Sequence, residues 1–231
     1  MINYKMLLSY DGGGFNGWQK QGNTENTVQG RLETALEKLT GQPVRLQGAG
    51  RTDRGVHAAG QVASFCLESA WDCDFLRDSL NQALSGSVAI QSVERAGPRF
   101  HARLNAGAKT YVYRLWDDIV PNVFERNYIW QCREITGPID EQALNDRLQR
   151  FTGEQDFRAF SRYTGKKSTV RSIYEVSAVR LGGEVRITFR GSGFLYNQVR
   201  LMVGWALTGE RYTAPARGLC LQHIEYVEGN L

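Results

Sequence analysis

One short loop contains an unusual density of side chains that could do chemistry. Residues 48–57, GAGRTDRGVH, bring together one carboxylate (Asp53), two guanidiniums (Arg51 and Arg54), a hydroxyl and one imidazole (His57). A carboxyl group close to arginine stays ionised, and an ionised carboxylate in a sheltered loop is a candidate nucleophile or base. The three glycines of the loop allow a ligand to approach the main chain. The alternative is a turn in which Asp53 only pairs with an arginine or caps the backbone.

Two other kinds of site fit the loop poorly. It lacks the GxxxxGK[ST] pattern, and the lysine, of a phosphate-binding loop. A metal site could be drawn from Asp53, His57 and His101, but the chain has 3 His and 4 Cys, with no H-x-x-x-H spacing and no CxxC pair. We therefore expect no metal, and hydrogen-bonding or packing roles for the two histidines. Scattered cysteines favour a reducing, cytoplasmic environment.

Positive charge is concentrated in one part of the chain. The net charge is only +4, but residues 161–200 contain eight basic and two acidic side chains. Segregated positive charge is typical of a polyanion binder, although a solvated basic face would look the same. No apolar run approaches the roughly 20 residues that span a bilayer, and the first residues lack a signal-peptide layout, so no membrane partner is expected.

Hydrophobic periodicity predicts the same order of elements in both halves: strand, helix, strand, strand, helix, strand. In the first half these are residues 4–10, 28–39, 44–47, 61–67, 74–84 and 88–93. In the second half they are residues 109–116, 140–151, 168–179, 184–190, 195–207 and 219–226.

This order predicts an α+β fold. Two β-α-β-β-α-β units suggest a tandem ferredoxin-like architecture, with residues 1–98 in the first unit and 99–231 in the second. We expect their strands to join into one mixed or antiparallel sheet, with the helices packed on one side.

Six separated motifs, in order along nearly the whole chain, resemble the TruA-type transfer RNA pseudouridine synthases. They are YDG…FNGWQ (10–19), TVQG…LE (27–33), GRTD.GVHA.GQV (50–62), FHAR…KTYVY (100–113), GFLYNQVR.MVG (193–204) and APA.GL (214–219).

The resemblance implies an enzyme that converts uridine to pseudouridine in the anticodon arm of transfer RNA, at positions thirty-eight to forty, without a cofactor. It implies that Asp53 is the nucleophile, attacking either the uracil ring or the ribose anomeric carbon. It further implies that Arg200 pairs with this aspartate, that Tyr111 stacks on the target base, and that Arg51 fills the gap left by a flipped base.

Basic side chains elsewhere are expected to bind phosphate and sugar, because A-form stems are recognised by shape. With His57, the candidates for RNA contact are Arg54, Arg103, Lys109, Lys166, Lys167 and Arg171.

The chain departs from the family at two places. Position 54 is arginine where a small residue is common, and only residues 205–213 separate the last helix motif from the closing Ala-Pro motif. The second departure affects the contacts of the homodimer, and the contacts with transfer RNA, that the resemblance implies.

Two other functions compete with this one. A catalytically silent RNA-binding relative would tolerate the loss of Asp53, so the joint presence of Asp53, Tyr111 and Arg200 disfavours it. A glycoside-cleaving enzyme needs a second carboxylate opposite the first, and neither motif around these residues supplies one.

Overall fold

The computed structural model describes residues 1–22, 24–84, 86–162, 165 and 168–226, and divides the chain into two compact units. Unit 1 comprises residues 1–107 together with 221–231, and unit 2 comprises residues 108–220. Unit 2 is thus inserted in sequence between two parts of unit 1, whereas the sequence pattern placed a single boundary between residues 98 and 99.

Unit 1 is built around three antiparallel strands in the order β4-β1-β3, and the two-residue strand β2 and most of β10 also lie next to β3. The bounds are β1 Ile2–Tyr10, β2 Gln47–Gly48, β3 His57–Leu67, β4 Val88–Arg95 and β10 Leu219–Tyr226. The order β4-β1-β3-β2 is that of the predicted β-α-β-β-α-β unit. The strand predicted over residues 44–47 was wrong in extent, because pairing begins only at Gln47.

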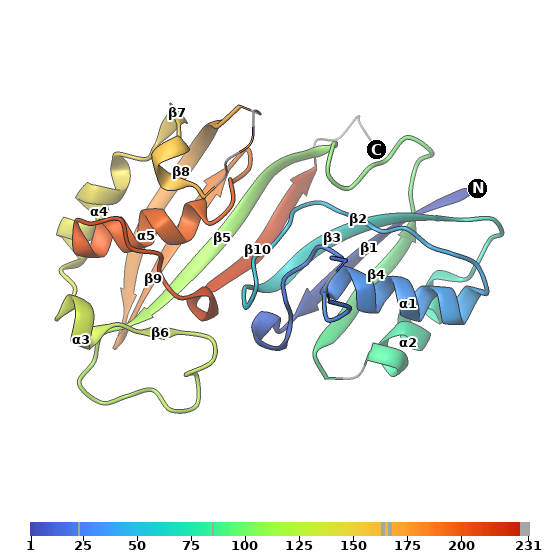
Figure 1. Ribbon diagram of the computed structural model, residues 1–231, viewed down its shortest axis with the longest axis horizontal. Coiled ribbons are helices and arrows are strands. Elements are labelled where there is room, and N and C mark those ends of the chain that lie inside the picture. The colour runs from blue at the N-terminus through green and yellow to red at the C-terminus, as the bar shows by residue number, and fades with distance from the viewer. Residues whose placement is uncertain (23, 85, 163–164, 166–167, 227–231) are drawn as a thin grey trace. The chain divides into compact units, whose positions relative to one another are not determined.

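Helices α1 (Val28–Thr40) and α2 (Cys73–Leu84) pack side by side on the sheet of unit 1 (Figure 1). The Thr27 side chain caps the first turn of α1 by accepting a hydrogen bond from Gly30 N at 3.2 Å. Gly41 ends the helix in the left-handed conformation, with φ 71°. Apolar residues at helical spacing, Leu32 and Leu36 among them, are buried, as the periodicity predicted.

Unit 2 has four antiparallel strands in the order β5-β9-β8-β7, and β6 pairs in parallel with β5. Its strands are β5 Ala106–Trp116, β6 Trp130–Gln131, β7 Gly153–Asp156, β8 Val170–Leu181 and β9 Glu184–Gly191. Its helices are α3 Arg133–Thr136, α4 Glu141–Gln149 and α5 Gln198–Thr208, and α4 packs against α5 (Figure 1). The β8–β9 hairpin turns at Gly182 and Gly183, as predicted, and the α+β class is confirmed.

The sequence pattern missed the short elements. Besides β6, β7 and α3, these are three 3-10 turns, η1 (Gly12–Gly14), η2 (Arg158–Phe160) and η3 (Ala216–Gly218). The last helix begins at Gln198 rather than at residue 195, because Asn197 has the left-handed φ of 61°. No helix in the described part of the chain is both long and apolar enough to cross a membrane.

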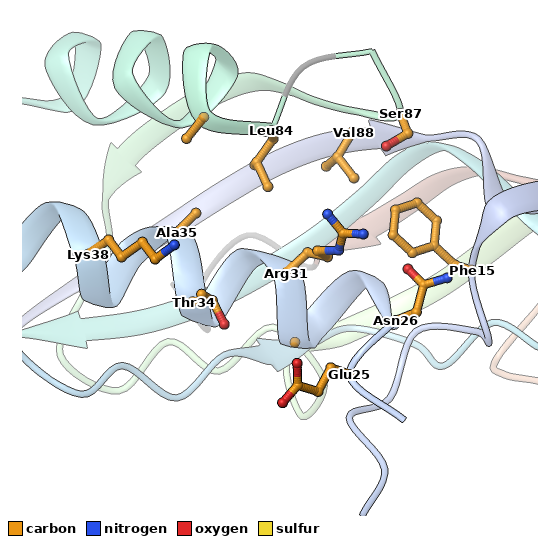
Figure 2. A pocket seen from close by; sticks show the side chains of 12 residues that line it. Phe15, Glu25, Asn26, Arg31, Thr34, Ala35, Lys38, Leu84, Ser87 and Val88 are labelled. Atoms are coloured by element: carbon orange, nitrogen blue, oxygen red, sulfur yellow. The ribbon is translucent and has the colours of Figure 1, made fainter. Parts of the chain in front are cut away.

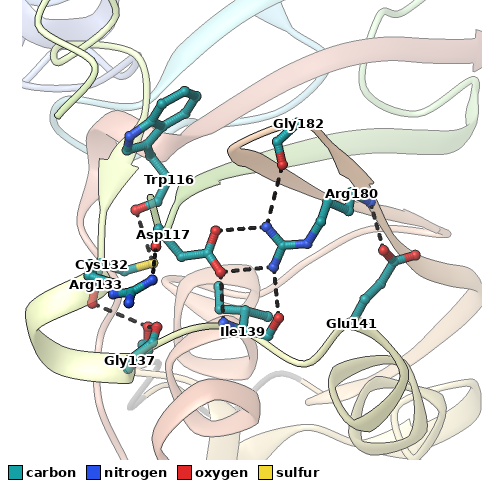
Figure 3. A network of polar contacts seen from close by, with 10 residues as sticks. Trp116, Asp117, Cys132, Arg133, Gly137, Ile139, Glu141, Arg180 and Gly182 are labelled. Atoms are coloured by element: carbon teal, nitrogen blue, oxygen red, sulfur yellow. Dashed lines mark hydrogen bonds and ion pairs between the residues drawn. The ribbon is translucent and has the colours of Figure 1, made fainter. Parts of the chain in front are cut away.

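An ion pair between a half-buried arginine and a buried carboxylate links the end of β5, the end of β8 and the segment before α4 (Figure 3). Arg180 donates two hydrogen bonds to the Asp117 carboxylate, of 2.9 and 2.8 Å, and one of 2.7 Å to Ile139 O. Ile139 N donates to the same carboxylate at 2.7 Å. The Asp117 side chain is only 4% exposed, and its hydrogen bonds with Arg180 lower its pKa below the ordinary value.

Removal of one partner from this network should destabilise unit 2. We expect Arg180→Met to lower the free energy of unfolding by about 3 kcal/mol, because it leaves the Asp117 carboxylate buried without its cation. Arg77→Met is the matched control, since Arg77 pairs with two well-exposed carboxylates, Asp74 and Asp78, and should cost less than about 1 kcal/mol. Urea unfolding measures both, and equal losses would contradict the assignment.

Candidate active site

The backbone of the Asp53 loop is held by hydrogen bonds from strands β1 and β3 and from the segment after η1. Gln61 Nε2 donates to Gly50 O at 2.9 Å, and Trp18 N donates to Thr52 O at 3.1 Å. The hydroxyls of Tyr10 and Thr52 share a buried hydrogen bond of 2.8 Å. The residue directly before Asp53 is therefore fixed through both its side chain and its carbonyl.

Glycines let the segment after β1 approach the loop closely. Gly17 has φ 92°, and a Cβ there would lie 2.9 Å from Thr52 O. A Cβ on Gly48 would lie 2.5 Å from the Trp18 indole, so the ring packs directly on the start of the loop. The motifs at residues 10–19 and 50–62, which are separate in sequence, therefore lie in direct contact.

Asp53 lies in a tight turn at the edge of this packed region. Its carbonyl accepts a hydrogen bond from Val56 N at 3.1 Å, and Gly55 provides the positive φ, 78°, that the turn requires. Asp53 is half-buried, whereas Arg51 and Arg54 are exposed. The loop therefore carries a half-buried carboxylate and two exposed guanidiniums on a backbone that its neighbours hold.

His57 contacts protein rather than solvent. It is buried, and its Nδ1 accepts a hydrogen bond of 3.1 Å from Gly12 N and lies 3.0 Å from Asp11 Oδ1. These contacts agree with the hydrogen-bonding role that the sequence left open. A contact between His57 and RNA stays a prediction.

Tyr111 and Arg200 are both in unit 2. Tyr111 lies opposite Phe189 in the β5–β9 register, is only 7% exposed, and meets the Phe194 ring edge-on at 5.3 Å. Arg200, in the first turn of α5, donates from Nε to Ala214 O at 2.7 Å. Both side chains are thus fixed by neighbours within their own unit.

The remaining candidates for RNA contact are spread over both units. Arg103 is exposed in unit 1, and Lys109 is half-buried on β5, opposite Gly191. Arg171, on β8, donates to Ser168 O at 3.1 Å. Lys166 and Lys167 lie outside the described residues.

The sequence did not indicate which residues support the candidate groups within each unit. Tyr10, Trp18 and Thr52 support the Asp53 loop, and Tyr113 donates from Oη to Pro215 O at 2.7 Å. Their only signal in the sequence was their place inside the motifs.

A cavity of about 510 Å³ opens elsewhere on unit 1, between α1 and the segment that leads into β4 (Figure 2). Arg31 and Lys38 of α1 line it, with Phe15 and Val88 among the opposing residues. None of the predicted site residues lines this cavity. Within the described residues, no group of three or more His, Cys, Asp or Glu side chains could hold a metal ion.

Comparison with known proteins decides the family. Residues 6–105 and 148–216 match the family model described as tRNA pseudouridine synthase. The chain belongs to this family. The matched ranges contain Asp53 and Arg200, and the family places the chain among the isomerases that form pseudouridine in transfer RNA.

Individual relatives match over most of the chain. The tRNA pseudouridine synthase A of Bacillus sp. (strain KSM-64) is 40% identical over 205 residues, which cover 88% of this chain and 83% of that protein. That of Maridesulfovibrio salexigens is 39% identical over 256 residues, covering 99% and 92%. That of Brevibacillus brevis is 36% identical over 248 residues, covering 98% and 100%. The last two alignments are longer than this 231-residue chain, so these relatives have residues that it lacks.

A side chain at Gly17 should displace the Asp53 loop. We expect Gly17→Ala to lower the rate of pseudouridine formation by at least about tenfold, because the Cβ strains the backbone and meets Thr52 O, at a cost of about 1–3 kcal/mol. Gly22→Ala is the control, since a Cβ at Gly22 would meet nothing within 4 Å. Single-turnover rates and thermal unfolding of both variants test this, and a wild-type rate in Gly17→Ala would refute it.

Proposed function

We propose that this chain isomerises uridine to pseudouridine in the anticodon arm of transfer RNA, at positions thirty-eight to forty, with Asp53 as the nucleophile. The observation that carries the proposal is the position of Asp53 in its loop. It directly follows Thr52, whose hydroxyl and carbonyl are both hydrogen-bonded, in a chain of the tRNA pseudouridine synthase family.

The reaction moves one bond without a net oxidation or reduction. The bond between N1 of uracil and C1′ of ribose breaks and a bond between C5 and C1′ forms. The proton of C5 is released to solvent, and N1 takes up a proton from solvent, so the product is an isomer of the substrate. Asp53 would supply a transient covalent bond, either to the uracil ring or to C1′. This balance requires no cofactor, and we propose that the enzyme uses none.

The other site residues would support this step. Arg200 would pair with the Asp53 carboxylate, since a guanidinium held at Nε presents a fixed cation. Tyr111 would stack on the extruded uracil, and Arg51, which is exposed, would fill the space that the base leaves. Extrusion of a base costs a few kcal/mol, and these contacts would offset that cost.

Contacts outside the site would be mainly to phosphate and sugar. The side chains proposed for them are Arg54, His57, Arg103, Lys109, Lys166, Lys167 and Arg171. We also propose that the enzyme acts in the cytoplasm as a homodimer.

Loss of the Asp53 carboxylate should stop the reaction and spare binding. We expect Asp53→Asn to lower single-turnover tritium release from 5-³H-uracil-labelled transfer RNA by more than about 10⁴-fold, because asparagine cannot act as the nucleophile. Filter binding should change by less than about threefold, since phosphate contacts supply most of the affinity. The control is Asp78→Asn, at an exposed carboxylate of α2. A rate in Asp53→Asn near that of the control would remove Asp53 from its proposed role.

The same reaction locates the target. Transfer RNA treated with the wild-type enzyme should contain new pseudouridine only at positions thirty-eight to forty, whereas RNA treated with Asp53→Asn should contain none. Modification confined to another arm would overturn the proposed substrate position and leave the family assignment intact.

A further inference from the structure

The backbone of residue 214 holds one edge of the Arg200 guanidinium. Arg200 Nε donates a hydrogen bond of 2.7 Å to Ala214 O, and Ala214 N donates one of 3.1 Å to Arg200 O. Because Nε is committed to this carbonyl, a carboxylate partner would be met by the two Nη groups at the tip of the guanidinium. The direction of that tip therefore depends on where the Ala214 carbonyl lies.

A buried tyrosine of β5 holds the next residue of the same segment. Tyr113 Oη donates a hydrogen bond of 2.7 Å to Pro215 O, and the side chain of Tyr113 is 0% exposed. Pro215 directly follows Ala214 and its ring fixes φ, so the position of one carbonyl constrains the other. A Cβ on Gly218 would lie 2.7 Å from the Tyr113 ring, which shows that the ring packs directly against η3.

Aromatic contacts and α5 itself enclose the other end of this segment. Trp130 meets Tyr113 edge-on at 6.3 Å and stacks on Tyr212 at 5.6 Å between ring centroids. The carbonyl of Tyr212 lies so close to Gly204 of α5 that any Cβ there would clash. Residues 212–215 are therefore held both by β5 and by the helix that carries Arg200.

The hydroxyl of Tyr113 stays protonated, so it can always donate a hydrogen bond. Burial raises the pKa of its phenol well above the ordinary value, and the opposing positive charge of Arg200 does not cancel that effect. The phenol thus keeps its proton at neutral pH and donates it to Pro215 O.

We infer that Tyr113 is a positioning residue for the reaction: its hydroxyl, acting through the carbonyls of Pro215 and Ala214, orients the Arg200 guanidinium. Tyr111 is two residues earlier on β5, so both tyrosines lie on the same face of the strand. One strand thus carries the ring proposed to stack on the base and the hydroxyl that orients the cation. The inference rests on the proposed function, in which Arg200 pairs with the nucleophile.

The substitution Tyr113→Phe removes only the hydroxyl and should slow the chemical step. We expect kcat for pseudouridine formation to fall about tenfold with KM unchanged, because the loss of one buried hydrogen bond loosens a group needed in the transition state. Tyr226→Phe is the matched control, because Tyr226 Oη donates to Ala102 O at the same 2.7 Å within unit 1. Its kcat should stay within about twofold of wild type.

A second experiment, in the Arg200→Lys variant, distinguishes positioning of Arg200 by Tyr113 from a general contribution of Tyr113 to the stability of the fold. In Arg200→Lys, which lacks the Nε bond to Ala214 O, the further change Tyr113→Phe should slow single turnover by less than about twofold, because the group it orients is already gone. Another tenfold loss in that background, or equal losses in Tyr113→Phe and Tyr226→Phe, would overturn the inference. Thermal unfolding of each variant confirms that the protein tested is folded.

The results that would overturn the proposed function differ from those that would overturn this inference. Absence of tritium release with wild-type enzyme would overturn the proposed reaction, and a wild-type rate in Arg200→Lys would overturn both the role of Arg200 and the inference. A wild-type kcat in Tyr113→Phe, with a slow Arg200→Lys, would overturn the inference alone.

Discussion

The hydrogen bond between the Tyr10 and Thr52 hydroxyls, together with the close approach of Gly17 to the Thr52 carbonyl, fixes the backbone that carries Asp53. A nucleophile that attacks one carbon of a large substrate gains most when its own position varies little, because misplacement by about 1 Å can cost a hundredfold in rate. Contacts between β1, β3 and the Asp53 loop hold the proposed nucleophile in this way. The geometry of the Asp53 loop therefore depends on the packing of the sheet in unit 1.

In unit 2, Arg200 and Tyr111 are held by contacts of a different kind. Arg200 donates from Nε to the Ala214 carbonyl, in the chain after α5, and Tyr111 packs edge-on against the Phe194 ring. At the end of β5, the Asp117–Arg180 pair anchors the strand to β8 and to the segment before α4. The Asp117–Arg180 pair thus anchors the C-terminal end of β5, and Tyr111 and Tyr113 lie in the middle of this strand.

The sequence predicted the long elements well, because their apolar periodicity extends over two or more turns or over many alternating residues. It missed β6 and β7, which are too short for a period, and it overestimated β2. The motifs pointed to Asp53, Tyr111 and Arg200, but not to the residues that hold them. The Tyr10–Thr52 contact joins residues 42 positions apart and the Tyr113–Pro215 contact joins residues 102 apart, so each depends on tertiary packing that no local pattern encodes.

We propose that Asp53 forms a covalent bond with the substrate. The most direct measurement is a rapid denaturing quench of excess enzyme with transfer RNA, followed by digestion with nuclease and protease and mass spectrometry of the peptides. We expect the peptide containing Asp53 to carry the mass of a nucleoside or nucleotide fragment during turnover, and Asp53→Asn to yield no such peptide. A nucleotide attached to a different residue of the wild-type enzyme would contradict the proposed role of Asp53.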